Sequence, residues 1–432
     1  MKYLLSSVII LPSLLSALSL SEAVQQTMET NPQIFVKKNI LQSEKELLQN
    51  SYSGYLPSVD LAYSAGRETT ETIANAHKQY TNNIQNASAS ITENVFEGFN
   101  TVYDVEKQKS LILSADSGVQ DAANSIALDV ITAYVDILKK KKLQEIAQEN
   151  VDVHKKYLDQ IKEKVDAGVD RKSDYKQTLS RYENAQSSFY LAEQNYKNAI
   201  TTFQRLLKVD VDADELEKPT VGDLPSEDID ELIEIALKNN PTIHVSQADI
   251  QTARATLKQS SSNYYPKADV QANAYWNKNL NGIQTTQLQP YDEEDGYNIM
   301  LKLSYNIFNG LSDRSIKESN RYKLLEKQNV LADSKRYVEA YTKISWQTFM
   351  STQDQMVHIA KNIEASKQTV ADYQQEHDLG RRSIIDLLNI ELEYNAARNR
   401  MVTTEYDHIL AYYQILTYTG KILESMNVSI EQ

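Results

Sequence analysis

The sequence lacks cysteine altogether, and it has few glycines and prolines, 11 and 8 in 432 residues. Without cysteine the chain can form no disulfide, no thiolate metal site, no catalytic thiol and no lipid anchor on an N-terminal cysteine. Positive charge is in deficit: the net charge of -14 argues against nucleic-acid binding, which needs a clustered basic face. The prolines leave two long tracts free, between Pro57 and Pro219 and after Pro290, and such tracts favour long helices.

The patterns that mark common catalytic and metal sites are missing as well. No Walker loop, Rossmann glycine pattern or GxSxG elbow occurs, and the histidines show neither HExxH nor paired-ligand spacing. The sequence therefore predicts no catalytic residue, no cofactor and no metal, and energy for any transport would have to come from partner proteins. The scattered histidines are His77, His154, His244, His358, His377 and His408.

The N-terminus has the composition of a secretory signal peptide. Lys2 precedes an apolar run over 4–18 that ends among small residues. We predict a signal peptide over 1–19, cleaved between Ala17 and Ser21, and the alternative is a buried first helix. No later stretch approaches the ~20 apolar residues of a membrane helix. The mature chain is thus expected to be exported, with any membrane span formed by β-strands.

The two halves of the chain repeat each other. Asn-Pro at 31–32 recurs at 240–241, an offset of 209, whereas Phe-x-Gly at 96–98 recurs at 308–310, an offset of 212. A duplication with one loop of different length explains both offsets, so each half is one structural unit of a pseudo-symmetric pair. The predicted divisions are a first repeat over 20–210, a connector over 211–226, a second repeat over 227–420 and a C-terminal tail over 421–432.

Four segments alternate apolar and polar residues in the manner of amphipathic strands. Two of them follow Tyr-x-Pro steps, where a helix cannot continue because the residue before proline is driven to extended geometry. Each segment has about the 9 to 11 residues that a tilted strand needs to cross a bilayer, although soluble antiparallel sheets alternate in the same way. We predict β-hairpins over 57–97 and 266–308, with strands at 57–65, 86–96, 268–276 and 297–307.

The tips of these hairpins are expected at 68–84 and 277–296. Both are polar, and their different lengths account for the change of offset. The second tip contains the acidic run 292–295, which is typical of a solvated loop.

Long helices are expected after each second strand. The tracts 99–167 and 311–379 would each reach about 100 Å as continuous helix. A break follows at Gly168 and Gly380, and the helices that return from it keep a 3,4 spacing in which aromatic residues alternate with alanine. This sustained heptad predicts coiled-coil packing, with the aromatic stripe in the core and not on a ligand-stacking surface. The predicted return helices are 170–207 and 383–420.

Four strands cannot close a barrel alone, because open sheet edges are not tolerated in lipid. The chain is therefore expected to oligomerise, and symmetry allows a dimer with eight strands or a trimer with twelve. Side chains fill an eight-stranded barrel, whereas a larger barrel leaves a lumen.

The whole pattern resembles the TolC family of trimeric outer-membrane channel-tunnels. The residues that carry the resemblance are the two Asn-Pro pairs, the two Tyr-x-Pro steps before strands and the two Phe-x-Gly steps after them. The most specific stretch is LGRRSIIDLLN at 379–389, which looks like the family's turn at the periplasmic tip. The resemblance implies a mainly α chain with a transmembrane β-barrel: twelve strands, four per chain, above a long α-helical coiled-coil tunnel in the periplasm of a Gram-negative bacterium.

The resemblance also implies a function. The chain would be a homotrimeric, passive outer-membrane exit duct, not an enzyme, that carries drugs or polypeptides. Its implied partners are outer-membrane lipid, a periplasmic adaptor (membrane fusion) protein and an inner-membrane ABC or proton-driven transporter. The alternative is an envelope-spanning structural coiled coil or a trimeric surface adhesin without transport, which also predicts long heptads but not two strand hairpins between helices.

Site residues are implied at the periplasmic tip. By position in the family motif, Asp386 would supply a ring of carboxylates at the aperture, and Asn389 stands where a second ring carboxylate is usual. The gate lock would comprise Arg382, Asp174, Asp170 and His377, with His377 in the place of a usual tyrosine. The turns expected to contact the adaptor contain Gly168, Val169, Gly380 and Arg381.

The charges at the tip support a lock on physical grounds. The two adjacent arginines begin a helix, where the macrodipole disfavours cations unless a carboxylate is near. Asp170 is the equivalent of Arg382 at the offset of 212, so opposite charges would alternate between neighbouring tips. We therefore expect Arg382 to bridge to Asp170 or Asp174. The alternative is two solvated arginines beside a capping box formed by Ser383 and Asp386.

Overall fold

The computed structural model describes residues 18–71, 79–208, 214, 216–279 and 293–430. The signal peptide expected over 1–19 thus lies outside the described residues except for its last two positions, and it stays a prediction. Ser19 begins helix α1 (Leu20–Thr30) with a capping box, because its hydroxyl accepts from the Glu22 amide at 3.3 Å and its own amide donates to the Glu22 carboxylate at 2.9 Å. In the described ranges, no helix combines the length and apolar character needed to cross a membrane.

The chain forms two compact units, and each draws on both halves of the sequence. The sheet unit contains Asn39–Ser117 and His244–Ala332. The helical unit contains the described parts of 1–38, 118–243 and 333–432. The two sequence repeats are therefore interleaved, and a repeat boundary is not the boundary of a compact unit.

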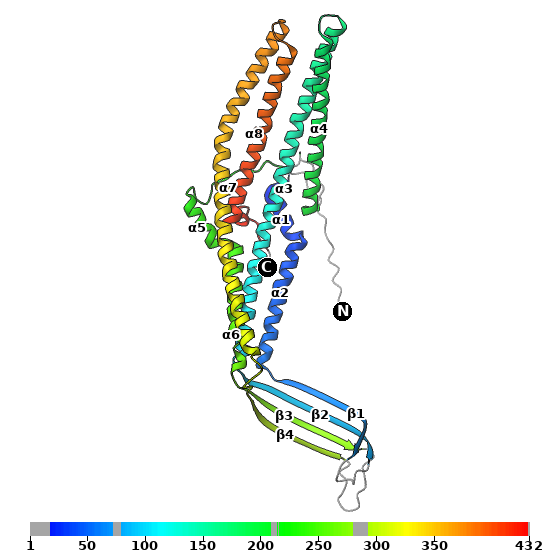
Figure 1. Ribbon diagram of the computed structural model, residues 1–432, viewed down its shortest axis with the longest axis vertical. Coiled ribbons are helices and arrows are strands. Elements are labelled where there is room, and N and C mark those ends of the chain that lie inside the picture. Colours follow the sequence, from blue (N-terminus) through cyan, green and yellow to red (C-terminus); the bar gives the residue numbers. More distant parts are fainter. Residues whose placement is uncertain (1–17, 72–78, 209–213, 215, 280–292, 431–432) are drawn as a thin grey trace, which may run out of the picture. The chain divides into compact units, whose positions relative to one another are not determined.

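The sheet unit contains one antiparallel sheet in the order β1-β2-β3-β4 (Figure 1). Residue pairing places Ala89 of β2 opposite Leu61 of β1 and Ala274 of β3, so the two hairpins join through β2 and β3. β1 and β4 are the edges of this sheet. The strands are β1 (Ser58–Glu71), β2 (Gln79–Glu97), β3 (Lys267–Asn279) and β4 (Glu293–Ser304).

The bounds of β4 correct the sequence prediction at both ends. The strand stops at Ser304, three residues before the expected end at 307. The Asn306 side chain accepts a hydrogen bond from the Phe308 amide at 3.1 Å, and such a local turn competes with the ladder. The strand also starts earlier than expected, at Glu293, so most of the acidic run lies in the sheet and not in a loop. Cross-strand pairing explains this, because Lys278 faces Glu293 and forms an ion pair at 3.3 Å.

β1 and β2 also extend further toward the hairpin tip than the alternation predicted. Their pairing continues to Glu71 opposite Gln79. Of the expected tips at 68–84 and 277–296, the parts at 72–78 and 280–292 lie outside the described residues.

The Phe-x-Gly steps after β2 and β4 turn the chain into long helices. Gly98 and Phe99 both have positive φ, 64° and 68°, and Gly310 and Leu311 repeat this pair with 70° and 68°. A Cβ at Gly98 would lie 2.3 Å from the Ser262 carbonyl oxygen, so glycine is required there. The strained Phe99 is held by ring contacts, including one to Phe96 at 5.3 Å between centroids.

The four longest helices, α3 (Asn100–Asp166), α4 (Lys172–Leu207), α7 (Ser312–Asp378) and α8 (Ile384–Tyr418), occupy the two proline-free tracts (Figure 1). α3 and α7 lie where the sequence predicted the long helices, and α4 and α8 where it predicted the returning ones. The Asn-Pro pairs separate α1 from α2 and α5 from α6, since proline is favoured at a first helical position. The helices are α1, α2 (Pro32–Tyr52), α3 (Asn100–Asp166), α4 (Lys172–Leu207), α5 (Ile229–Asn239), α6 (Pro241–Gln259), α7 (Ser312–Asp378), α8 (Ile384–Tyr418) and the one-turn α9 (Ile422–Ser425), with single 3-10 turns at Ser53–Tyr55 and Ser262–Tyr264.

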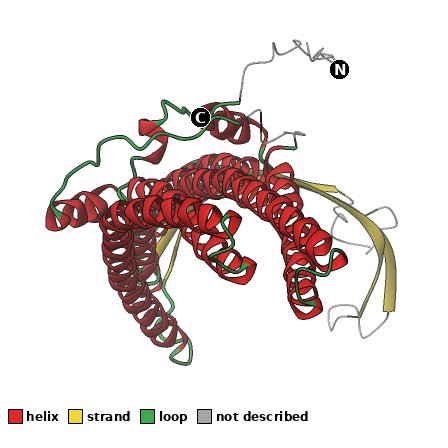
Figure 2. Ribbon diagram, turned by 90° about the horizontal axis from the view of Figure 1, so that it is seen from above, coloured by secondary structure: helices red, strands yellow, loops and turns green. Residues whose placement is uncertain are grey.

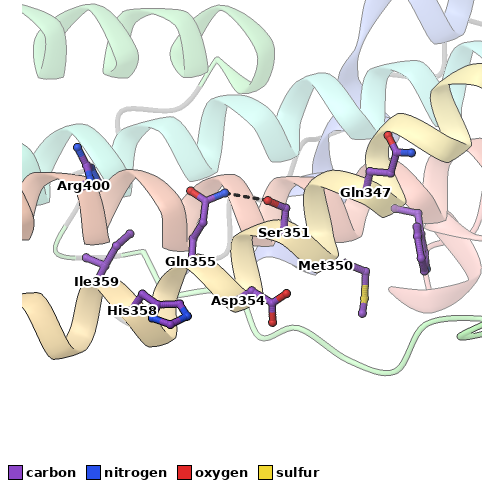
Figure 3. A pocket seen from close by; sticks show the side chains of 9 residues that line it. Gln347, Met350, Ser351, Asp354, Gln355, His358, Ile359 and Arg400 are labelled. Atoms are coloured by element: carbon purple, nitrogen blue, oxygen red, sulfur yellow. Dashed lines mark hydrogen bonds between the residues drawn. The ribbon is translucent and has the colours of Figure 1, made fainter.

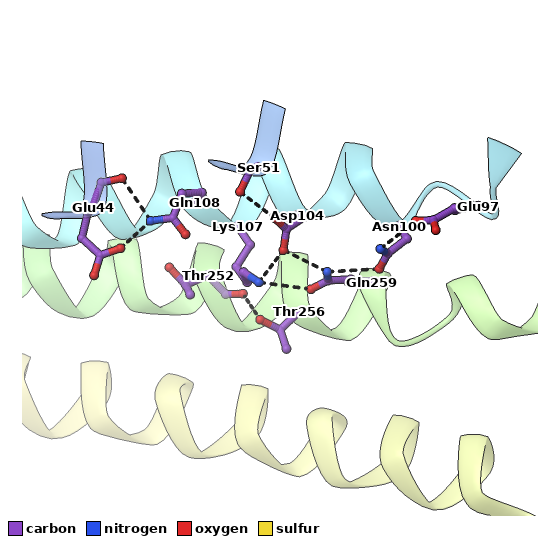
Figure 4. A network of polar contacts seen from close by, with 10 residues as sticks. All are labelled: Glu44, Ser51, Glu97, Asn100, Asp104, Lys107, Gln108, Thr252, Thr256 and Gln259. Carbon is purple, nitrogen blue, oxygen red and sulfur yellow. Dashed lines mark hydrogen bonds and ion pairs between the residues drawn. The ribbon is translucent and has the colours of Figure 1, made fainter. Parts of the chain in front are cut away.

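A polar network fastens three helices of the sheet unit to one another (Figure 4). The Asp104 carboxylate of α3 accepts from Lys107 at 2.6 Å, from Ser51 of α2 at 2.6 Å and from Gln259 of α6 at 3.0 Å. Burial would raise the pKa of Asp104, but these donors outweigh burial and lower it. The network thus holds the helices that precede both hairpins against the helix that follows the first.

In the helical unit, the helices lie side by side (Figure 2) and share one large apolar core. Every position of the predicted heptad stripe is buried or half-buried, and the buried positions include Ala185, Ala199 and Phe203 on α4 and Leu387 and Ile415 on α8. Of its aromatic rings Phe203 is buried, and the half-buried Tyr175, Tyr182 and Tyr196 pack against the apolar cores. Next to the hairpin turns a second, smaller core joins α3, α7 and α8 around Ile161 and Leu388.

Candidate functional site: the two helical hairpin turns

The α3–α4 turn and the α7–α8 turn have the same backbone geometry. Gly168 and Gly380 have φ of 75° and 71°, and a Cβ added at either glycine would meet no atom within 4 Å. In each turn the amide of the third residue after the helix donates to a carbonyl five positions back, Val169 N to Lys164 O at 2.9 Å and Arg381 N to Glu376 O at 2.8 Å. These are Schellman caps, which need a left-handed residue and favour glycine. The duplication therefore preserves the turns themselves.

The tip residues expected to contact an adaptor are all exposed in the helical unit. Gly168, Val169, Gly380 and Arg381 lie on the surface. Val169 is 77% exposed and the neighbouring Leu379 is 69% exposed, so each turn presents one apolar side chain to solvent.

Arg382 is fixed within its own hairpin. Its Nε donates to the Glu376 carboxylate at 2.8 Å, and its guanidinium stacks 3.9 Å from the centre of the Tyr373 ring. The Glu376 carboxylate raises the pKa of Arg382. Neither partner was expected from the sequence, because Glu376 and Tyr373 lie on the far side of the turn and are brought back by the Schellman cap.

The two acidic residues of the predicted lock have local partners in this single chain. Asp170 accepts from the Arg171 amide at 3.2 Å, and Asp174 accepts from the Ser173 hydroxyl at 3.0 Å. Among the ion pairs of the described residues, none joins Arg382 to Asp170 or Asp174. That bridge would join neighbouring tips, and it stays a prediction.

His377 ties the two hairpins together. It is buried, and its Nδ1 lies 2.9 Å from the backbone oxygen of Arg382. Since a carbonyl can only accept, Nδ1 donates, and the lone pair of Nε2 is left to accept from the Lys164 ammonium at 3.2 Å. The end of α3 is thereby linked to the α7–α8 turn through a neutral imidazole.

The expected aperture residues lie on the first turns of α8. Asp386 accepts from the Ser383 hydroxyl at 2.7 Å, and its amide donates to the Ser383 oxygen at 3.2 Å. The N-cap of the alternative hypothesis is therefore present, although Arg382 is not simply solvated. Asn389 follows three positions later on the same helix face, is exposed, and accepts from Arg181 of α4 at 2.8 Å.

Arg181 is a residue that the sequence reasoning missed. A signal was available: at the offset of 212 its equivalent is Glu393, a charge reversal like that between Asp170 and Arg382. Lys164, which contacts His377, is likewise the equivalent of Glu376. The positions where the repeats differ in charge are thus those that form contacts at the turns.

Glu391, two residues after Asn389 on α8, is a buried carboxyl group. Glu391 is only 7% exposed, and burial raises its pKa against the opposing effects of Tyr157, Arg398 and Lys156. Tyr157 in turn donates to the Gln374 side-chain oxygen at 3.0 Å. Helices α3, α7 and α8 therefore meet in a polar contact just behind the turns.

A cavity along α7 in the helical unit offers no catalytic arrangement. Its volume is about 580 Å³, and it runs along α7 beside Arg400 of α8 (Figure 3). Asp354 and His358 point from the same helix face, but no cluster of three metal-ligating side chains occurs anywhere in the described part of the chain. The cavity is an open groove between two helices.

The fold defines a subunit of a channel-tunnel, with four strands and two long helical hairpins per chain. A family model described as outer membrane efflux protein matches residues 23–207 and 232–421. Together these ranges cover most of the chain and leave out the connector, in agreement with a duplicated sequence. The chain belongs to this family.

Individual relatives agree with the family match. The chain is 19% identical over 417 residues to the alkaline protease secretion protein AprF of Pseudomonas aeruginosa, covering 95% of this chain and 86% of AprF. It is 19% identical over 422 residues to the outer membrane protein TolC of Vibrio cholerae, covering 96% of this chain and 93% of TolC.

Solved structures show the same fold. The CmeC outer-membrane channel of Campylobacter jejuni superposes with a TM-score of 0.82 at 13% identity, over 93% of this chain and 86% of CmeC. The outer-membrane channel OprN gives 0.82 at 16% identity, over 93% and 90%. The open MtrE channel of Neisseria gonorrhoeae gives 0.76 at 13% identity, over 94% and 89%.

These findings confirm the family, the fold class and the location expected from the sequence. The protein is an outer-membrane exit duct for efflux or type I secretion, with its helical tunnel in the periplasm, and it is not an enzyme. Channels of this family are trimeric and work with an adaptor and an inner-membrane transporter. The structural-scaffold alternative is set aside.

Proposed function

We propose that this chain forms a homotrimer whose twelve strands close one barrel and whose helical hairpins close the opposite mouth of the duct. The observation that carries the proposal is the apolar face of edge strand β4. Tyr297, Ile299, Leu301 and Leu303 alternate along it, and each is at least 72% exposed. An edge strand with such a face must be paired when it lies in lipid, and three copies provide enough strands for an open lumen.

Conductance tests this proposal directly. Purified protein should migrate as a heat-modifiable trimer and should give uniform conductance steps in planar lipid bilayers, because a twelve-stranded barrel leaves a water-filled lumen. A correctly folded trimer that gives no conductance under any voltage would support the scaffold alternative and overturn the duct.

The aperture is proposed to lie at the hairpin turns. Three Asp386 carboxylates would form its acidic ring, with Asn389 one helical turn behind. Arg382, Asp174, Asp170 and His377 would hold the turns of neighbouring hairpins together in the closed state. Support comes from the observed contacts, since Arg382 is already oriented by Glu376 and Tyr373 and His377 already links two hairpins.

Replacing Arg382 by serine is expected to raise the mean single-channel conductance severalfold, because the lock loses its cation in all three copies. Arg381→Ser is the matched control, since it removes an exposed arginine from the adjacent position and should leave the conductance unchanged. A conductance of Arg382→Ser at the closed wild-type level would eliminate the lock. An equal rise in both variants would assign the effect to net charge.

The adaptor is proposed to contact the exposed turns at Gly168, Val169, Gly380 and Arg381. An apolar side chain such as Val169 at 77% exposure is suited to burial against a partner.

The cargo is proposed to be set by the inner-membrane transporter. AprF is named for secretion of a protease and BepC of Brucella suis for efflux, so polypeptide secretion and drug efflux are both candidate functions for this chain. Val169→Cys provides a site for crosslinking. Identification of the captured adaptor and transporter decides between drug efflux and polypeptide secretion.

A further inference from the structure

The arginine that contacts the aperture has an uncompensated charge. Arg181 of α4 donates its Nη2 to the Asn389 side-chain oxygen at 2.8 Å. Among the described residues no carboxylate lies within ion-pair distance of this guanidinium, whereas Arg398, two turns further along α8, is paired with Glu149 at 2.6 Å. The positive charge of Arg181 is therefore held at the aperture without being neutralised.

A buried imidazole also interacts with Arg181. His154 of α3 is 4% exposed, and burial together with the charge of Arg181 lowers the pKa of His154. Its Nδ1 contacts the Asn150 backbone oxygen at 2.8 Å, and the Asn150 side chain accepts from Asn395 of α8 at 2.9 Å. Two asparagine amides thus lie beside this imidazole, and neither has a charge that could pair with the arginine.

The position of Arg181 relative to Asp386 follows from helix geometry. Asn389 lies three residues from Asp386, so the two levels are separated by about 4.5 Å along the α8 axis and share one face. In a threefold assembly the constriction would carry three carboxylates at one level and three guanidiniums at the next. Such a collar is nearly neutral overall, unlike a collar of two carboxylate rings.

We propose that Arg181 is a specificity-determining residue of the duct, which offsets the Asp386 ring and allows anionic cargo to pass the constriction. This inference rests on the proposed aperture at Asp386 and Asn389. Asn389 acts as the positioning residue: its amide oxygen holds the guanidinium at the rim without cancelling its charge, which a carboxylate at that position would do.

Ion selectivity in planar bilayers tests the proposal. With a salt gradient of potassium chloride, Arg181→Gln should raise the permeability ratio of potassium to chloride severalfold. Hexaamminecobalt(III) should block the variant at a concentration about tenfold lower than the wild type, because a trivalent cation would meet an acidic collar without opposing charge. Arg181→Lys should retain the wild-type selectivity.

Two controls separate this result from other causes. Arg398→Gln removes a paired arginine from the same helical unit and should leave the selectivity unchanged. Asn389→Ala removes the amide that holds Arg181 and changes no charge. The permeability ratio of potassium to chloride should therefore rise, but less than in Arg181→Gln. If Arg181→Gln conducts normally with wild-type selectivity and block, the inference is wrong; if the wild-type trimer does not conduct, the proposed duct itself has failed.

Discussion

Replacing Tyr134 by alanine is expected to destabilise the helical unit by about 3–5 kcal/mol, the usual cost of removing a large aromatic ring from a packed core. Tyr134 is fully buried on α3, and its ring meets Phe203 of α4 edge-on, 6.0 Å between centroids. Its hydroxyl lies 2.7 Å from the Leu18 carbonyl oxygen and 2.8 Å from that of Glu217. Burial raises the pKa of Tyr134, so the hydroxyl stays protonated and donates.

The hydroxyl joins three segments that are distant in sequence. Leu18 forms a parallel β-bridge with Leu216 of the connector. The Tyr134 hydroxyl donates to carbonyl oxygens on both sides of this bridge, those of Leu18 and Glu217. Tyr134→Phe keeps the ring and removes only the donor, so it should cost about 1 kcal/mol. Tyr190→Ala serves as the matched control, because Tyr190 on α4 is 62% exposed and should change stability little.

Hydrogen exchange of α3 and α4 peptides measures these effects locally, which matters because a chain with two compact units need not unfold in one step. We expect exchange to accelerate in the order Tyr190→Ala, Tyr134→Phe, Tyr134→Ala. Equal protection in Tyr134→Ala and wild type would contradict the proposed role of Tyr134 as the anchor of the N-terminal segment and the connector.

The helical part of the fold was predictable because its signals are local and repeated. α3 ends at Asp166 and α7 at Asp378, each just before the glycine that the sequence marked as a break. The proline-free tracts and the 3,4 spacing fix both the length of a helix and its buried face. The duplication then supplied each signal twice.

Strand ends were less predictable, since they depend on partners and not on alternation. Apolar residues continue to alternate beyond Ser304, yet the Asn306 side chain makes a turn with Phe308. In the opposite sense, the acidic residues at the start of β4 are poor strand formers, but pairing with β3 and the contact between Lys278 and Glu293 keep them in the ladder.

The site was predictable in its positions but not in its contacts. The family motif located Asp386 and Arg382, whereas the actual partner of Arg382 depends on how a Schellman cap returns the chain to Glu376. The contact of Arg181 with Asn389 spans 208 positions, and no local pattern encodes it. Comparing the charges of the two repeats is the one sequence operation that points to such residues.

Replacing Glu391 by glutamine is expected to have a second large effect, on the pH dependence of stability. We infer that Glu391 is protonated in the folded chain. Glu391 lies on α8 behind the turns and is 7% exposed, and burial outweighs the lowering effects of Tyr157, Arg398 and Lys156 on its pKa. Ionisation of Glu391 would therefore place a charge in a buried site, which costs stability.

Burial of Glu391 makes the helical unit less stable as the pH rises. Burial raises the pKa of Glu391 above its ordinary value of 4.5, so its contribution to stability is fully present below that value and is lost as the pH rises through the raised pKa. Glu391→Gln cannot ionise and keeps the size of the side chain. It should therefore match the wild type near about pH 4 and be more stable by roughly 1–2 kcal/mol near about pH 8.

Hydrogen exchange of α8 peptides across this pH range, corrected for the intrinsic exchange rate, measures the difference. Glu393→Gln is the matched control, because it removes an exposed carboxylate two positions away and should follow the wild-type pH dependence. The inferred protonation of Glu391 is wrong if Glu391→Gln and the wild type lose protection in parallel as the pH rises.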